Sequence, residues 1–348
     1  MNKEFFDALE ELSIEKGINK DYLLDAIENA LVTAYKRNFN SSENVKIVVD
    51  EDNASIKVYS LKEVVEEVFD PAIEIDLDAA RKVNKKAKLE DIVEIEITPK
   101  DFGRISAQTA KQVIVQKIRE AEREIVFSEY SDRQGEIVSG MVQKVDKNVI
   151  IVDLGRLEGV MTLNEQIPGE IYEVNDRIKA YVLEVQKSSK GVPQMLISRT
   201  HPGFVKRLLE LEIPEIYEGL IEIKNIVREP GSRTKVAVYS TDPNIDPVGS
   251  CVGPRGTRIQ NILNELKNEK IDVVEWSEDP VQYIASALSP ATVLAVDIDE
   301  VNMASKVVVP DTQLSLAIGK DGQNARLSAK LTGWKIDIKS ETQIKSGE

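Results

Sequence analysis

Two short loops with glycine at both ends carry the residue types best suited to chemistry in this chain. They are Gly253-Pro254-Arg255-Gly256 and Gly319-Lys320-Asp321-Gly322. Glycine accepts positive φ and allows another backbone to approach closely. A predicted helix follows each loop, and the unpaired N–H groups at its start favour a bound anion. Each loop therefore predicts a binding site for a phosphate group.

Cationic side chains flank both predicted phosphate-binding sites. Arg255 and Lys320 lie inside the loops, and Arg258 and Arg326 lie in the first turns beyond them. Such cations form charge-assisted hydrogen bonds with phosphate oxygens. The predicted binding residues of the two loops and the turns that follow them, together with two cations of a preceding strand and its loop, are Gly253, Pro254, Arg255, Gly256, Arg258, Gly319, Lys320, Asp321, Gly322, Gln323, Asn324, Arg326, Arg233 and Lys235.

The elements that position the two loops repeat. After each loop, apolar residues recur at three- and four-residue spacing, which predicts a helix, and strands follow at 271–274 and 334–338. This order resembles the KH domain, whose Gly-X-X-Gly loop clamps single-stranded nucleic acid by its backbone. A single Gly-X-X-Gly sequence is equally typical of a tight turn, but the repeated context favours the KH interpretation.

Catalytic alternatives rest on weaker patterns. Cys251 has no histidine nearby and an apolar neighbour, which is typical of a packed thiol rather than a nucleophile. Asp297, Asp299 and Glu300 could hold Mg²⁺, but alternation on a strand favours solvated acid. The chain also lacks the Gly-x-x-x-x-Gly-Lys-[Ser/Thr] loop of nucleoside-triphosphate enzymes. We expect neither an enzyme nor a cofactor.

Composition and charge limit the remaining classes. The 348 residues are 42% hydrophobic and 30% charged, which is ordinary for a globular protein. One cysteine and one histidine exclude an internal disulfide and a His-rich metal site. No apolar run approaches the ~20 residues of a membrane span, and no secretory signal is expected at the N-terminus. These features indicate a cytoplasmic protein that does not bind membranes.

The charge is uneven along the chain. The net charge is −15 overall, with −9 in residues 1–134, −1 in 135–199 and −5 in 200–348. A negative total disfavours non-specific nucleic-acid binding, which depends on summed phosphate neutralisation. We therefore expect an acidic N-terminal head that meets a protein partner, and RNA contacts made by a few placed cations.

The N-terminal part predicts an α+β head. Its expected elements are helices at 2–16 and 20–38, a hairpin of strands 45–49 and 55–59 with a turn at 50–53, a short helix near 76–84, a strand at 94–97, a long helix at 105–127 and a linker at 128–134.

The next part predicts a small barrel. Five β-rich runs, at 136–142, 148–153, 157–161, 177–183 and 194–198, suggest an OB-type fold that resembles the S1-type RNA-binding barrel. Val149 and Met161 stand where such barrels carry base-stacking aromatics, which leaves Tyr172 and Tyr181 as substitutes. The barrel is thus expected to bind RNA weakly or to act as a spacer.

The remaining sequence completes the two KH modules. A helix near 204–215, strands at 221–223 and 235–239, a joining helix at 280–288, strands at 293–297 and 306–309 and a frayed tail at 340–348 are expected. The predicted fold is multidomain α+β, and its domains are the head with its connecting helix (1–134), the S1-type barrel (135–199), the first KH domain (200–279) and the second KH domain with the tail (280–348).

This order of modules, and the wording of several segments, resembles the NusA family of bacterial transcription termination/antitermination factors. The matching segments are 101–112, 214–216, 229–233, 245–249 and 317–327. The resemblance implies a factor that docks its head on RNA polymerase near the RNA exit channel. Its barrel and KH pair would guide single-stranded nascent RNA, favouring pausing and intrinsic termination, or antitermination when other factors join.

Two rival functions use the same modules. A ribosome-associated or mRNA-associated RNA-binding protein would attach them to another machine. An RNA-degrading enzyme with KH and OB modules would place them after large catalytic domains, whereas here they follow the 134-residue head.

Overall fold

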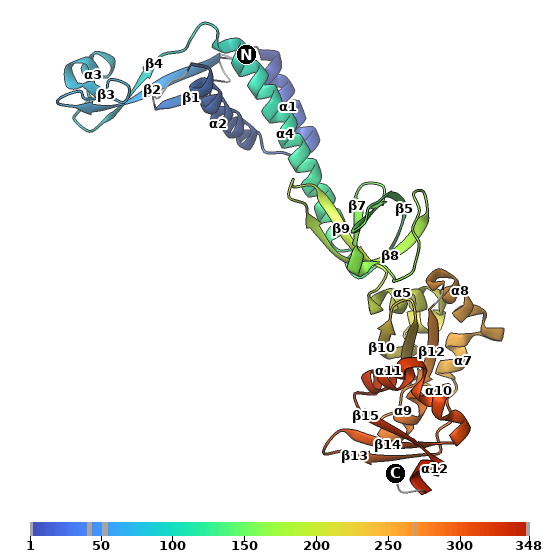
Figure 1. Ribbon diagram of the computed structural model, residues 1–348. Coiled ribbons are helices and arrows are strands. Elements are labelled where there is room, and N and C mark those ends of the chain that lie inside the picture. The colour runs from blue at the N-terminus through green and yellow to red at the C-terminus, as the bar shows by residue number, and fades with distance from the viewer. Residues whose placement is uncertain (1–2, 40–43, 51–54, 268, 346–348) are drawn as a thin grey trace. The chain divides into compact units, whose positions relative to one another are not determined.

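The computed structural model describes residues 3–39, 44–50, 55–267 and 269–345, and the chain forms two compact units, Met1–Val126 and Phe127–Glu348 (Figure 1). Apart from Asp50, the turn predicted at 50–53 lies outside the described residues, as do residues 346–348 of the predicted tail. None of the helices in the described ranges is long and apolar enough to span a membrane.

The larger part of the first unit packs helices on a hairpin. Helices α1 (Lys3–Lys16), α2 (Lys20–Phe39) and the start of α4 (Phe102–Ser131) cover strands β1 (Val45–Asp50) and β2 (Ser55–Val65). The helical spacing of Leu23, Ile27 and Leu31 places all three in the core, where each is fully buried. The predicted hairpin is present, with β1 and β2 antiparallel.

The rest of the first unit is a small lobe with a core of its own. It contains the end of β2, β3 (Glu74–Asp76), α3 (Leu77–Val83) and β4 (Ile92–Glu96), packed around Val64, Ala80, Ala87 and Val93. Strand β2 is parallel to β3 and antiparallel to β4. The Asp76 carboxylate caps α3 by accepting hydrogen bonds from two backbone N–H groups. The three-residue β3 was not predicted, because so short a strand has no detectable alternation.

The second unit begins with a barrel. Strands β5 (Ile137–Val145), β6 (Val149–Asp153), β7 (Glu158–Thr162), β8 (Arg177–Lys187) and β9 (Pro193–Ser198) close in the order β5-β6-β7-β9-β8, which confirms the five-stranded prediction. The linker predicted from residue 128 is wrong at its start, since α4 continues to Ser131. The Ser131 hydroxyl donates to the Phe127 carbonyl, and the segment has no glycine before Gly135 to end the helix.

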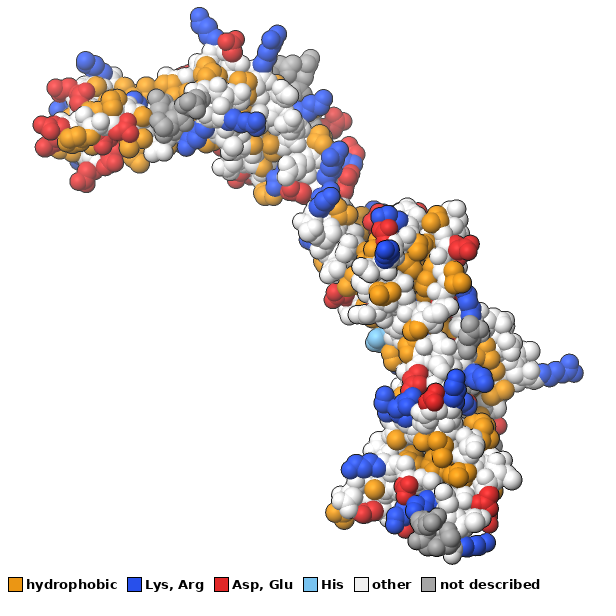
Figure 2. All heavy atoms as spheres, viewed as in Figure 1, with side chains coloured by type: hydrophobic (Ala, Val, Ile, Leu, Met, Phe, Trp, Pro, Cys, Tyr) orange, Lys and Arg blue, Asp and Glu red, His pale blue; other side chains and the backbone are white. Residues whose placement is uncertain are grey.

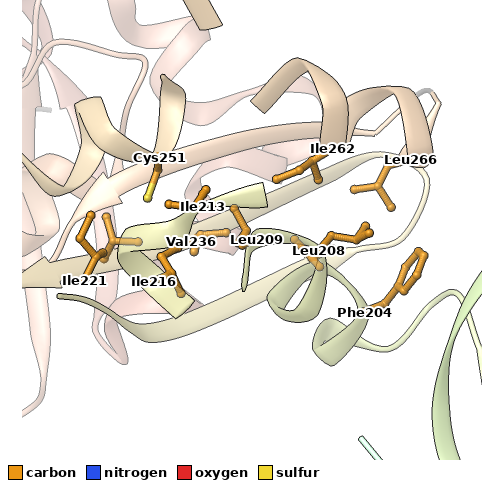
Figure 3. Packing of buried hydrophobic residues seen from close by; sticks show 12 residues of the cluster. Phe204, Leu208, Leu209, Ile213, Ile216, Ile221, Val236, Cys251, Ile262 and Leu266 are labelled. Atoms are coloured by element: carbon orange, nitrogen blue, oxygen red, sulfur yellow. The ribbon is translucent and has the colours of Figure 1, made fainter. Parts of the chain in front are cut away.

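Two α/β modules of the same design follow the barrel. The first contains α5 (Pro202–Glu212), α6 (Pro214–Tyr217), β10 (Ile221–Glu229), β11 (Arg233–Ser240), α7 (Pro247–Val252), α8 (Thr257–Leu266) and β12 (Lys270–Glu275). Strand β11 is central, antiparallel to β10 and parallel to β12. The helices bury the apolar cluster that contains Leu209, Ile213 and Val236 against one face of this sheet (Figure 3).

The second module repeats the topology of the first. Its elements are α9 (Pro280–Ala287), β13 (Ala295–Asp299), β14 (Ala304–Val309), α10 (Leu314–Ile318), α11 (Gln323–Thr332), β15 (Lys335–Ser340) and α12 (Glu341–Lys345). The predicted fraying at the tail is wrong for residues 341–345, which form α12. The Thr342 hydroxyl donates to the Asp311 carboxylate at 2.7 Å and ties this helix to the module.

A buried ion pair holds the hairpin between β10 and β11. The Arg228 guanidinium donates two hydrogen bonds of 2.8 Å to the Glu269 carboxylate, and both side chains are fully buried. The same carboxylate accepts from the Thr234 hydroxyl and the Gly231 backbone N–H. A buried charge is tolerated only when it is paired and hydrogen-bonded in this way.

We predict that Glu269→Ala lowers the free energy of unfolding of the second unit by about 3–5 kcal/mol, because it leaves Arg228 charged and unpaired in the interior. Urea unfolding followed by tryptophan fluorescence reports this unit alone, since both tryptophans, Trp276 and Trp334, lie in it. Glu222→Ala, at a side chain that is 62% exposed, is the control. Equal unfolding midpoints for the two variants would contradict the prediction.

Candidate nucleic-acid interface

The two Gly-X-X-Gly loops have the same backbone. In the first, Gly253, Arg255 and Gly256 have φ of 75°, 56° and 76°. In the second, Gly319, Asp321 and Gly322 have φ of 76°, 53° and 73°. Three positive φ values in four residues turn each chain sharply between two helices, α7 and α8 or α10 and α11. The first glycine is also needed for space, because a Cβ on Gly319 would lie 2.8 Å from the Asn324 nitrogen.

The two central cations are available at the surface. Arg255 and Lys320 are exposed, and neither makes an ion pair within the described part of the chain. The backbone bend directs each loop away from the module core, next to the N-terminus of α8 or α11. This arrangement can attract a phosphate without first breaking an internal contact.

The cations of the following helical turns are already paired. The Arg258 guanidinium donates to Glu215 at 2.8 Å and to the Ser250 carbonyl at 2.7 Å. The Arg326 guanidinium donates to Glu229 at 2.8 Å. The sequence analysis missed both glutamates, because they come from α6 and from the end of β10, far from the loops in sequence.

Two predicted polar residues of the second loop point into the protein. The Asn324 side chain is 1% exposed, and its amide nitrogen donates to the carbonyls of Leu288 and Ala317 at 3.0 Å. The Gln323 amide donates to Glu229 at 2.8 Å and to the Ser232 hydroxyl at 2.7 Å. Asn324 therefore fixes the loop in place, and Gln323 contacts the first module.

Two predicted RNA contacts on β11 are also engaged. Arg233 forms a two-point ion pair with Asp272, at 2.6 and 2.9 Å. Lys235 is fully buried and donates to Asp272 at 3.1 Å and to the Ser289 carbonyl at 2.7 Å. Burial lowers the pKa of this ammonium, and the Asp272 charge opposes that shift. Lys235 thus joins the two modules and does not face solvent.

The second module covers the outer face of the first module's sheet. Ala237 and Val274 of the sheet pack with Tyr283 and Leu331 of α9 and α11. The Leu331 carbonyl accepts hydrogen bonds from Asn225 at 2.8 Å and from the Tyr283 hydroxyl at 3.1 Å. The two loops are consequently held in one frame.

The barrel offers no free aromatic ring at the predicted positions. Tyr172 is buried, and its hydroxyl donates to Glu170 and accepts from the Ile167 N–H; burial raises its pKa. Tyr181 stacks on His201 with ring centroids 4.7 Å apart. Both rings pack within the second unit, so neither is free to stack on a base, and the weak RNA binding of the barrel stays a prediction.

The acidic residues considered for magnesium lie on the open face of the second sheet. Asp297 and Asp299 line a hollow of about 460 Å³ together with Lys306 and Lys335. Among the described residues no group of three or more His, Cys, Asp or Glu side chains is placed to hold a metal ion.

Protein-family models match almost the whole chain. Residues 4–124 match the NusA N-terminal domain, residues 131–193 the S1 RNA binding domain, residues 199–276 the NusA-like first KH domain and residues 280–346 the NusA-like second KH domain. The transcription termination/antitermination protein NusA of Halalkalibacterium halodurans is 58% identical over 343 residues, which cover 99% of this chain and 90% of that protein. The chain belongs to the NusA family.

A second relative agrees with this assignment, and a solved domain is similar to part of the chain. The NusA protein of Bacillus subtilis is 55% identical over 345 residues, covering 99% of this chain and 93% of that protein. The solution structure of the N-terminal domain of NusA from B. subtilis is similar over 35% of this chain and 99% of that domain, with 51% identity and a TM-score of 0.33. The chain is therefore an RNA-binding transcription factor of the NusA family, built from a NusA head, an S1 barrel and two KH domains, and it is not an RNA-degrading enzyme.

Cys251 lies in the core of the first KH domain. Figure 3 shows its sulfur among the packed side chains, and the residue is 0% exposed. Burial raises the pKa of the thiol to about 12, and the Glu215 carboxylate adds to the shift. A thiol in this state is a poor nucleophile.

We predict that iodoacetamide at pH 8 does not label the folded protein and labels it fully in urea, because Cys251 is the single cysteine and is buried as a thiol. Mass spectrometry of the intact chain measures the modification. Rapid labelling without denaturant would show that the thiol is accessible and reopen a catalytic role for this residue.

Proposed function

We propose that the N-terminal head of this transcription factor binds RNA polymerase, and that the two KH loops hold the emerging RNA as a single strand. Other antitermination factors are expected to join this complex in the cytoplasm. The proposal includes domain boundaries near residues 134, 199 and 279. The observation that carries the RNA part is the matched pair of loops, each with positive φ at three positions and one exposed cation that has no ion-pair partner in the described part of the chain.

The loop residues divide into contacts and supports. Arg255 and Lys320 are the proposed phosphate contacts, and the glycines bring the backbone N–H groups close to the strand. Arg258 and Asn324 hold the loops in shape. Lys235 is omitted from the proposed contacts because it is buried between the KH domains.

We predict that Pro254→Asp with Arg255→Asp lowers the affinity for single-stranded RNA by roughly 10- to 150-fold, because loss of one charge-assisted contact costs about 1.5–3 kcal/mol. Fluorescence anisotropy with a labelled, unstructured RNA measures it. Both side chains are exposed, so the fold should be unaffected. The control Lys36→Asp with Asn38→Asp changes the net charge equally, at exposed positions of the head. Unchanged RNA affinity in the loop variant would show that the loop is only a turn and does not contact RNA.

The small lobe of the head carries the surface best suited to a protein partner. Phe69 is 84% exposed and Ile92 68% exposed, and Val83, Leu89 and Val68 are also exposed. Figure 2 shows acidic side chains in red around apolar ones in orange on the lobe that contains α3. Exposed aromatic and aliphatic side chains rimmed by charge are typical of interaction sites. This surface supports the proposed docking of the head on RNA polymerase.

We predict that Phe69→Ser weakens binding to RNA polymerase core by roughly tenfold or more, since an aromatic anchor at an interface commonly contributes over 1–2 kcal/mol. Val301→Ser, at a side chain that is 93% exposed in the second KH domain, is the matched control. Binding is measured by surface plasmon resonance on immobilised core enzyme, with ribosomes as a second analyte. Binding of the parent chain to ribosomes but not to polymerase would favour the ribosome-associated alternative.

A further inference from the structure

The first turn of α11 already holds an anion. The Glu229 carboxylate, at the end of β10, accepts from Arg326 Nε on one oxygen and from Gln323 Nε2 on the other, both at 2.8 Å. Gln323 is the first residue of α11, and Arg326 follows one turn later. The Arg326 guanidinium holds the pKa of the Glu229 carboxyl below its ordinary value, so this group is charged at neutral pH.

These donors are the ones that a phosphate would use. A guanidinium, a side-chain amide and the positive end of a helix dipole bind a phosphate and a carboxylate by the same hydrogen bonds. The second Gly-X-X-Gly loop lies immediately before this turn, so an RNA backbone held by Lys320 passes beside Arg326. A phosphate and the Glu229 carboxylate therefore compete for one guanidinium.

Solvent reaches this pair. The Arg326 side chain is 47% exposed and the Glu229 side chain 27% exposed. An ion pair at such exposure contributes little to stability, so a phosphate can replace the carboxylate at small cost. Glu229 belongs to the first KH domain and Arg326 to the second, but the hydrogen bonds from Lys235 to the Ser289 carbonyl and from Asn225 to the Leu331 carbonyl keep the domains together when this pair opens.

The first loop differs in this respect. Arg258 is also paired with a glutamate, but it donates to the Ser250 carbonyl as well, and its side chain packs under Gly253, where an added Cβ would lie 2.8 Å from Arg258 Cγ. Arg258 is therefore part of the loop's framework. Arg326 also donates to a loop carbonyl, that of Asp321 at 3.2 Å, but its side chain is 47% exposed, and its side-chain partner among the described residues, Glu229, comes from the neighbouring domain.

We propose that Glu229 is an internal competitor for RNA at the second KH loop: its carboxylate occupies Arg326 until an RNA phosphate displaces it. Glu229 thereby sets the affinity of the second loop for RNA and limits the binding of other anions at Arg326. This inference rests on the proposed function, since it requires RNA to pass the second loop.

The test is the RNA affinity of Glu229→Gln measured by anisotropy over a series of salt concentrations. The probe is an unstructured single-stranded RNA long enough to span both loops. The variant frees Arg326 for a phosphate, so affinity should rise roughly two- to fivefold, in line with the strength of an ion pair at this exposure. The phosphate contact of Arg326 forms in both proteins once RNA has displaced Glu229, so the slope of log K against log salt should change no more in this variant than in a control that removes a distant charge.

Two further variants separate competition from a purely structural role. Glu222→Gln removes the same charge from an exposed position of the same strand and controls for net charge. Arg326→Ala should lower the affinity and make Glu229→Gln silent when the two are combined. If Glu229 only joins the domains, Glu229→Gln will leave the affinity equal to that of Glu222→Gln or lower, and that result would overturn the proposal.

The fold and the underlying function are checked separately. Tryptophan fluorescence confirms that each variant is folded, and Glu229→Asp serves as a second variant that keeps the charge but shortens the side chain; it should raise the affinity less than Glu229→Gln. If the parent chain does not bind RNA at all, the proposed function fails. If the parent binds and Glu229→Gln does not bind more tightly, only the competition fails.

Discussion

The second unit depends on three buried cations, each of which could reach solvent only by losing a hydrogen-bonding partner. Arg199 joins Glu170 of the barrel to Glu265 of α8, Arg228 pairs with Glu269, and Lys235 reaches from β11 to the carbonyl of Ser289. Burial alone would raise the pKa of Glu170, but the Arg199 guanidinium outweighs it and holds that pKa below its usual value. Because an unpaired buried charge is so costly, Arg199 fixes the barrel against the first KH domain and Lys235 fixes the two KH domains against each other, while Arg228 holds the hairpin of the first KH domain.

A fixed frame changes what two weak RNA sites can do. Each loop presents one cation that makes no ion pair with the described residues, and the chain as a whole is acidic, so neither loop gains much from general attraction to RNA. Two sites at a set distance act on one strand together, because the second contact is intramolecular once the first has formed. In the proposed function, the rigid junctions supply the affinity that the sparse cations lack, and the carboxylate that competes for Arg326 lowers it.

The sequence predicted what depends on local pattern. The helical spacing of Leu23, Ile27 and Leu31, the five barrel strands and the repeated loops all follow from periodicity and glycine placement, and the family resemblance rested on long matching segments. The pairing of side chains could not be predicted. Lys235 looked like an RNA contact because it is a cation on a strand near the loop. Its burial depends on α9 packing against that face, and no local pattern records such a partner. Glu215 and Glu229 were missed for the same reason, because only the packing of distant elements brings them to the arginines.

The central claim is that the two loops hold one strand in a fixed frame, and the dependence of affinity on RNA length tests it most directly. Anisotropy with a series of unstructured RNAs of increasing length should show a sharp rise once an RNA reaches both loops, on the order of 10²- to 10⁴-fold above the shorter RNAs. The rise should disappear in a variant of the second loop that combines Lys320→Asp with Asp321→Ala. An affinity that grows only gradually with length, equally in both proteins, would contradict the account.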